Sequence, residues 1–122
     1  MQLSHRFDIS RNMDQSAALA ALSALGQDTR LQAFRLLVKA GDEGMPAGEI
    51  AARLAVPANT LSTHLRIVEQ AGLLRSQREG RVIRYFADFT GMRDLLAFLM
   101  EDCCGGRPEL CAPVIEAVTC RC

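Results

Sequence analysis

The sequence lacks any apolar run long enough to span a bilayer. Its longest apolar runs, such as "LLAFLM" at residues 95–100, hold six residues, whereas a transmembrane helix needs about 20. The opening stretch, "MQLSHRFDISRN", also lacks the apolar core of a secretory signal. We therefore expect a cytoplasmic chain with no membrane partner, in a compartment that keeps thiols reduced.

An even set of cysteines is also missing. The chain has five, all between residues 103 and 122, and an odd number excludes a complete set of intramolecular disulfides. In a reducing compartment, these thiols are better interpreted as metal ligands, redox groups or filler.

Net charge is absent as well, so the overall balance favours no particular partner. The distribution is uneven: residues 28–87 hold nine Lys and Arg against six Asp and Glu, whereas residues 88–122 hold three against six. The middle of the chain is therefore the part suited to an anionic partner.

The sequence contains no nucleophile motif and no phosphate-cradling glycine loop, so we do not expect an enzyme. It also has no internal repeat, low-complexity tract or interdomain linker. We expect a flexible N-terminal arm over residues 1–13, one folded domain over 14–102 and a cysteine-rich C-terminal sensor segment over 103–122.

The apolar periodicity changes once along the chain. Helical patterns cover residues 14–25, 28–40, 47–54 and 57–70, with Leu19, Leu22 and Leu25 on one stripe of the first helix. In the second helix, Leu31, Phe34 and Val38 are predicted to face inward, and in the fourth Leu61, Leu65 and Val68.

A strand period then replaces the helical one. "LLRSQ" and "VIRYFA" are predicted as strands, joined by a turn that contains Gly80. Thr90 is predicted to cap a last long helix that presents Met92, Leu95, Leu96 and Leu99 on one face. Pro113 is predicted to start a final helical turn or two.

This order predicts a mainly α fold with a β-hairpin wing, a winged helix-turn-helix with the element order α-α-α-α-β-β-α. The second helix of that motif enters the DNA major groove, and the wing lies beside the backbone or minor groove. Each polar residue taken singly fits an ordinary solvated surface, but the ordered combination favours double-stranded DNA as the partner. The candidate DNA-binding residues are Asn59, Thr60, Ser62, Thr63, His64, Arg66, Arg78, Arg81 and Arg84.

Three stretches resemble the arsenic-responsive repressor family (ArsR/SmtB): "ALGQDTRLQAFRLL", "GEIAARLAVPANTLSTHLRIVEQAGLL" and "SQREGRVIRYF". The resemblance covers roughly residues 15 to 100, and its most specific part runs from Ser62 to Leu73. It implies a homodimer formed by the first and last helices. It also implies an inverted-repeat operator that the repressor leaves when a metal or metalloid ion binds.

Two sensor sites known in that family are missing. The segment "GMPAGEIAARL" before the reading helix has no cysteine, so a C-V-C site is absent. No histidine follows His64, so a zinc site of Asp, His and Glu on the last helices is absent too. His64 itself is better interpreted as a DNA-contacting or packing residue than as a ligand, because the only other histidine is His5.

Only sulfur remains as a ligand, which indicates a soft ion. The adjacent Cys103 and Cys104, with Cys111 brought back by the hinge residues Gly105 and Gly106, suit a three-coordinate pyramidal centre better than tetrahedral zinc. Trivalent arsenic (arsenite) or antimony forms such centres. We therefore expect it as the inducer, with no organic cofactor and with derepression of metalloid-resistance genes as the outcome.

Other interpretations stay open. Cys103 and Cys104 could sense redox state by forming a disulfide with Cys111, or the pair alone could bind a methylated trivalent arsenical. Cys120 and Cys122 could supply a replacement ligand or an auxiliary site, although we favour plain surface thiols. A purely structural module would not bind DNA with a steep salt dependence. For a DNA-binding dimer, the slope of log K against log salt has a ceiling of about −9, set by Arg66, Arg75, Arg78, Arg81 and Arg84 in both protomers.

Overall fold

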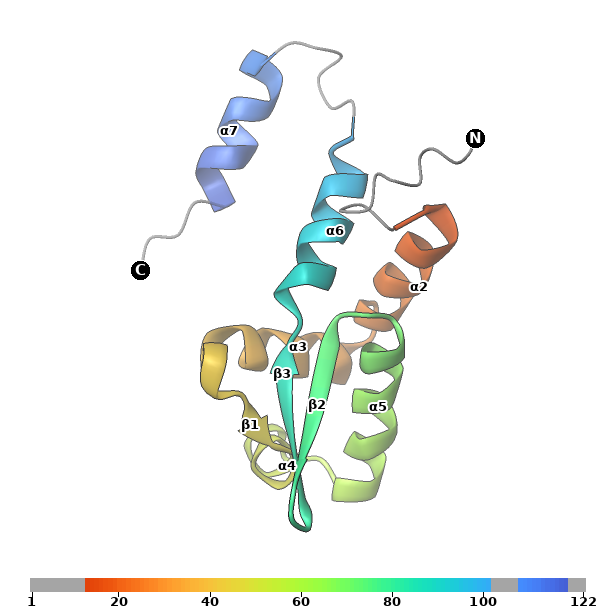
Figure 1. The fold of residues 1–122 in the computed structure, drawn as a ribbon, viewed down its shortest axis with the longest axis vertical. Coiled ribbons are helices and arrows are strands. Elements are labelled where there is room, and N and C mark those ends of the chain that lie inside the picture. The colour runs from red at the N-terminus through yellow and green to blue at the C-terminus, as the bar shows by residue number, and fades with distance from the viewer. Residues whose placement is uncertain (1–12, 102–107, 119–122) are drawn as a thin grey trace.

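The computed structural model describes residues 13–101 and 108–118 (Figure 1). The candidate ligands Cys103, Cys104, Cys120 and Cys122 and the hinge glycines lie outside these ranges. The elements, in chain order, are α2 (Gln15–Leu25), α3 (Asp28–Ala40), the 3-10 turn η1 (Gly41–Glu43), β1 (Met45–Pro46), α4 (Ala47–Leu54), α5 (Ala58–Gln70), β2 (Leu74–Glu79), β3 (Val82–Ala87), α6 (Phe89–Leu99) and α7 (Pro108–Val118).

The predicted fold class is confirmed: four helices, a hairpin and a further helix follow one another in the expected order. The hairpin pairs β2 with β3 in antiparallel register from Leu74 opposite Ala87 to Glu79 opposite Val82. Gly80 adopts a φ of 68° in the two-residue turn, which a tight hairpin favours. Figure 1 shows the tip of this hairpin at the opposite end of the molecule from α6.

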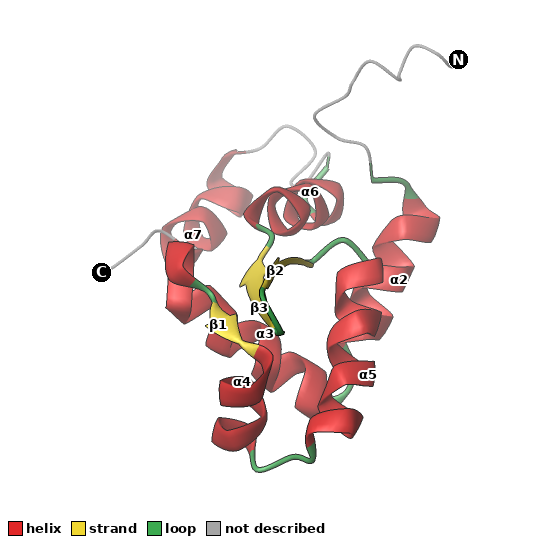
Figure 2. Cartoon of the chain, turned by 60° about the horizontal axis from the view of Figure 1, so that its bottom comes forward, coloured by secondary structure: helices red, strands yellow, loops and turns green. Residues whose placement is uncertain are grey.

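A third strand, which the sequence did not predict, completes the sheet. β1 pairs with β3, placing Met45 opposite Tyr85, so the strand order is β1-β3-β2. Gly44 makes this pairing possible, because it has a φ of 60° and a side chain there would collide with the Tyr85 carbonyl and the Phe86 ring. Figure 2 shows the short strands in the middle of the molecule with helices around them.

The hydrophobic core lies where α3 and α5 meet each other and the sheet. α3 contacts α2, α4, α5 and β3, which makes it the central helix. The largest side chains that are almost fully buried come from the three helices α3, α4 and α5 and from the turn after α5: Leu37, Ile50, Leu61, Leu65, Val68 and Leu73. The predicted inner stripe of α5 is therefore confirmed.

The predicted leucine stripe of α2 is not the face that α2 buries, although Leu25 packs partly against the core. Its buried residues are Ala18, Ala21 and Ala24, whereas Leu19 and Leu22 are 58% and 43% exposed. Alanine has no side chain beyond Cβ, so it allows the α2 backbone to approach its neighbours closely. The leucines are consequently left on an outward apolar surface. Leu31, predicted to face inward from α3, is also exposed.

The last two helices also differ from expectation. Asp88, not Thr90, caps α6, since its carboxylate accepts hydrogen bonds from the Thr90 and Gly91 backbone N–H groups at 3.1 Å. α7 begins at Pro108 instead of Pro113 and runs for eleven residues. A proline at the first position suits a helix start. Among residues 13–101 and 108–118, no helix is long and apolar enough to cross a membrane.

Candidate nucleic-acid interface

The turn between α4 and α5 sets the angle of the helix-turn-helix. Ala55 adopts a left-handed conformation (φ 56°, ψ 47°) at the end of α4, and its N–H donates to the last turn of that helix. Pro57 then occupies the N-cap position with an extended ψ of 142°, so that α5 starts at Ala58. These residues turn the chain within three positions and leave α5 with its apolar stripe on the core.

The opposite side of α5 carries the predicted base-reading residues. Asn59, Thr60, Ser62, Thr63 and Arg66 are all exposed. The Asn59 carboxamide oxygen accepts a hydrogen bond from the Thr60 N–H at 2.9 Å. The structure thus groups five of the predicted side chains on one hydrogen-bonding surface of one helix, as a helix that reads base edges requires.

His64 occupies a different position from these five. It is half-buried, and its Nδ1 lies 3.2 Å from an Arg30 Nη1. Arg30 is absent from the candidate residues that we predicted. Its contact with His64 joins positions 34 residues apart, and no local pattern in the sequence signals such a contact.

The wing arginines fall into two groups. Arg78 and Arg81 are exposed at the hairpin tip, where Arg78 makes one long contact of 3.4 Å with the Gly80 carbonyl. Arg75 instead places its guanidinium 4.3 Å from the centre of the Phe86 ring, a cation–π arrangement. The tip of the wing therefore carries two exposed arginines, as the prediction of a DNA-contacting wing requires.

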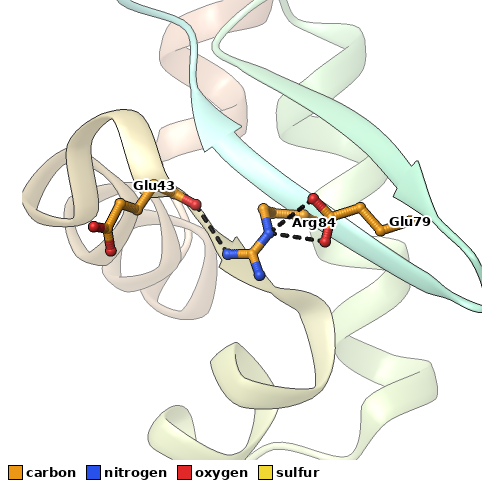
Figure 3. Close-up of polar contacts among 3 residues, drawn as sticks. All are labelled: Glu43, Glu79 and Arg84. Atoms are coloured by element: carbon orange, nitrogen blue, oxygen red, sulfur yellow. Dashed lines mark hydrogen bonds and ion pairs between the residues drawn. The ribbon is translucent and has the colours of Figure 1, made fainter.

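Arg84, another predicted DNA contact, is engaged within the protein (Figure 3). Its Nε lies 3.1 Å from both carboxylate oxygens of Glu79, and one Nη donates to the Glu43 carbonyl at 2.9 Å. Arg84 is half-buried. These contacts join both strands of the wing to the η1 turn, so in this structure Arg84 braces the hairpin.

The wing is also tied to α5. The Ser76 hydroxyl donates to the Glu69 carboxylate at 2.8 Å. Tyr85 is opposite Ser76 in the hairpin register and is buried. Burial, together with the negative charge of Glu69, raises the pKa of Tyr85 above the ordinary 10.0, although Arg66 lowers it in part. Charged side chains of α5, Glu69 and Arg66, therefore act on a residue of the wing strand β3.

The raised pKa of Tyr85 predicts a loss of stability at high pH. The folded state keeps the phenol proton above pH 10 while the unfolded state releases it, so the free energy of unfolding falls as pH rises from 10 through the folded pKa. The chain has one tyrosine and no tryptophan, so tyrosinate absorbance reports Tyr85 alone. We expect its transition at higher pH in the folded protein than in urea. Coincident transitions would contradict the prediction, and Tyr85→Phe should remove this component of the pH dependence.

Cys111 is the one predicted sensor residue that the structure describes. It lies within α7, whereas the predicted helix start at Pro113 would have placed it before the helix. Its side chain is 8% exposed, and it takes part in a disulfide bond. Within the two described ranges, no group of three or more His, Cys, Asp or Glu side chains is placed to hold a metal ion. The remaining candidate ligands lie outside those ranges.

The helix-turn-helix, the polar face of α5 and the basic hairpin define a winged-helix DNA-binding protein. A family model described as a helix-turn-helix domain matches residues 25–77. The transcriptional repressor SdpR of Bacillus subtilis is 32% identical over 77 residues, which span 63% of this chain and 82% of SdpR. The chain belongs to the ArsR/SmtB family of transcriptional regulators, which bind DNA and are not enzymes.

Solved structures agree with this assignment. HlyU of Vibrio cholerae, whose curated sequence is described as a transcriptional activator, is 27% identical with a TM-score of 0.57; the match covers 71% of this chain and 97% of HlyU. A possible transcriptional regulator for arsenical resistance is 26% identical with a TM-score of 0.58, over 81% of this chain and 97% of that structure. One curated relative is longer, and the chain spans 17% of it.

Proposed function

We propose that this regulator is a homodimeric repressor that leaves its operator when trivalent arsenic or antimony binds Cys103, Cys104 and Cys111. α5 reads base edges in the major groove, and the tips of the two wings contact the DNA backbone. Release of the inverted-repeat operator then derepresses metalloid-resistance genes. The name of SdpR supports repression, and one structural relative is named for arsenical resistance.

An outward apolar surface supports dimerisation through α2 and α6. Leu19 and Leu22 are exposed on α2, and Leu96 and Leu99 are 46% and 49% exposed on α6. The two helices pack against each other within the protomer (Figure 1). Large apolar side chains gathered on neighbouring helices indicate a protein–protein contact, because covering them removes apolar area from water. A symmetric second copy is the simplest partner for such a surface.

The environment of Cys111 is the observation that carries the inducer proposal. Its side chain is buried within α7, and its sulfur takes part in a disulfide bond. An all-sulfur donor set selects soft ions. Once reduced, Cys111 would provide one of the three thiols of the proposed ligand set.

The binding step balances without an added oxidant or reductant. Three thiols replace the three hydroxyl groups of arsenous acid, three As–S bonds form, and the thiol protons leave in three water molecules. Changing the ratio of released to DNA-bound dimer from 1:99 to 99:1 requires about 5.5 kcal/mol of differential ion binding, or ~2.7 kcal/mol per site with two sites. Linking the segment after α6 to α7 couples ion binding to a helix of the proposed dimer surface.

The test is an operator titration by fluorescence anisotropy, with a duplex first selected from a random-sequence library by the wild-type protein. The reductant is a phosphine, because a dithiol would itself bind arsenite. We expect arsenite to release the wild type, and Cys103→Ser, Cys104→Ser and Cys111→Ser each to abolish release. The matched control, Cys120→Ser with Cys122→Ser, should respond like wild type; if this double variant is the unresponsive one, the proposed ligand set is wrong.

A second candidate, thiol redox sensing, is favoured by the disulfide bond of Cys111. In that case an oxidant such as a peroxide would release the operator through two-electron oxidation of two thiols to a disulfide, with the oxidant reduced. The same variants separate the candidates. Release by peroxide in the absence of arsenite, lost in Cys111→Ser and reversed by the phosphine, would establish redox sensing.

A further inference from the structure

Arg30 contacts two helices at once. It lies in the first turn of α3, and its Nε donates to the Ala24 carbonyl in the last turn of α2 at 2.6 Å. One of its Nη atoms lies 3.2 Å from Nδ1 of His64 on α5. Both Arg30 and His64 are half-buried. A single guanidinium therefore joins the end of α2 to the middle of the reading helix.

The chemistry of this contact fixes the role of each atom. A guanidinium is always protonated and can only donate hydrogen bonds, so His64 Nδ1 must accept. This contact requires the tautomer in which the ring N–H is on Nε2. The Ala24 carbonyl belongs to the last turn of α2, where carbonyl groups have no partner within the helix and a positive charge is favourable. The two contacts thus use two of the five N–H donors of the guanidinium, which point in different directions.

The location of the contact gives it a consequence for DNA binding. The carbonyl end belongs to α2, which carries the exposed leucines, and the imidazole end belongs to α5, next to Ser62 and Thr63. Apolar packing of Leu61, Leu65 and Val68 holds α5 on the core, but such contacts are non-directional. A directional hydrogen bond restricts the rotation of the helix about its own axis, and this rotation determines which side chains reach the bases.

We propose that Arg30 is a positioning residue for DNA binding, which acts on the reading helix through His64 Nδ1 and on α2 through the Ala24 carbonyl. The inference rests on the proposed use of α5 as the reading helix. In this arrangement His64 acts through the nitrogen that faces the protein, and Arg30 makes no contact with a phosphate.

Two substitutions of His64 distinguish its nitrogens. An asparagine places an amide oxygen near the position of Nδ1 and keeps an acceptor for Arg30, whereas a glutamine reaches toward the position of Nε2. We expect His64→Asn to bind the selected duplex within about threefold of wild type and His64→Gln to bind about tenfold more weakly. The opposite order would show that His64 contacts DNA directly through Nε2 and would overturn the proposal.

Arg30→Gln is expected to weaken binding by about tenfold with an unchanged salt slope, since no phosphate contact is lost. Arg30→Lys should not restore it, and Arg30→Gln combined with His64→Gln should be about as weak as either alone. The matched control is Arg35→Gln, an exposed position of the same helix. Affinities are measured at a temperature where circular dichroism shows each variant fully folded.

Three results would overturn the inference. A salt slope reduced by about 0.9 per protomer in Arg30→Gln would make Arg30 a phosphate contact. Equal affinities of Arg30→Gln and Arg35→Gln would show that Arg30 has no specific role in DNA binding. Additive losses of binding free energy in the Arg30→Gln, His64→Gln double variant would show that Arg30 does not act through His64. A wild-type chain that selects no duplex would instead contradict the proposed function, and the inference with it.

Discussion

Replacing Gly91 by alanine is expected to lower the free energy of unfolding by about 3 kcal/mol, in the upper range for overpacked sites. Gly91 lies in the first turn of α6 against the turn after α5, where a Cβ atom would overlap the Gly72 carbonyl group. The obstructing atoms are backbone, and the adjacent Leu73 is fully buried and accepts a hydrogen bond from the Asp88 N–H at 2.9 Å. The start of α6 must therefore move, and its Asp88 cap is lost with it.

Gly48→Ala provides the matched control. Gly48 lies inside α4, and a Cβ atom there would meet nothing within 4 Å. Alanine should stabilise the chain by about 0.5–1 kcal/mol, because it restricts the unfolded chain and favours the helix. Urea denaturation of the two variants and wild type measures both effects. If Gly91→Ala is as stable as Gly48→Ala, α6 is not held against the end of α5 as the structure shows.

This contact also matters for the proposed function. Gly72 follows Ala71, the C-cap residue of α5, and α6 is the helix that leads to the cysteine segment. Close backbone packing between Gly91 and Gly72 means that a displacement of α6 presses on the end of the reading helix and is not absorbed by flexible side chains. Gly91→Ala should therefore weaken DNA binding even where circular dichroism shows the variant folded.

Local patterns in the sequence were sufficient to predict most of the fold. α4 has the predicted bounds, the three inward residues of α5 were predicted, and the hairpin lies where Gly80 and the β-branched residues indicated it. The inner face of α2 was not predictable in the same way. Alanine and leucine alternate there at helical spacing, so two neighbouring stripes are both apolar and only the neighbouring helices decide which is buried.

The candidate DNA-binding residues likewise divide into those placed by local sequence pattern and those held by distant contacts. Residues whose exposure follows from helix period alone, such as Ser62 and Thr63, lie on the surface where the sequence placed them. Arg84 and His64 are instead engaged by the Glu43 carbonyl and by Arg30. These partners are 41 and 34 residues away in the sequence, so no local pattern predicts the contacts. Charge and residue type indicate that an arginine suits DNA; they do not reveal a distant carbonyl or imidazole that already engages it.

The number of arginines that are not engaged within the protein predicts the salt dependence of DNA binding. Arg75 stacks on Phe86, and Arg84 is held by Glu79 and the Glu43 carbonyl. The exposed arginines of α5 and the wing without a ring or carboxylate contact among the described residues are then Arg66, Arg78 and Arg81. In the proposed dimer these are six side chains, and at about 0.9 for each phosphate neutralised the slope of log K against log salt is about −5. Between 50 and 200 mM salt, affinity should fall by about three orders of magnitude.

Removing the two arginines of the wing tip tests this assignment. Arg78→Ala with Arg81→Ala deletes four of the six contacts in a dimer, so the slope should fall to about −2. Arg75→Ala serves as the control and should leave the slope at about −5, although it loses the stacking on Phe86. The slopes come from anisotropy titrations of a random-sequence duplex across the salt range. A wild-type slope near about −9 would mean that Arg75 and Arg84 exchange their protein partners for phosphates, and the hairpin would then have to rearrange on DNA.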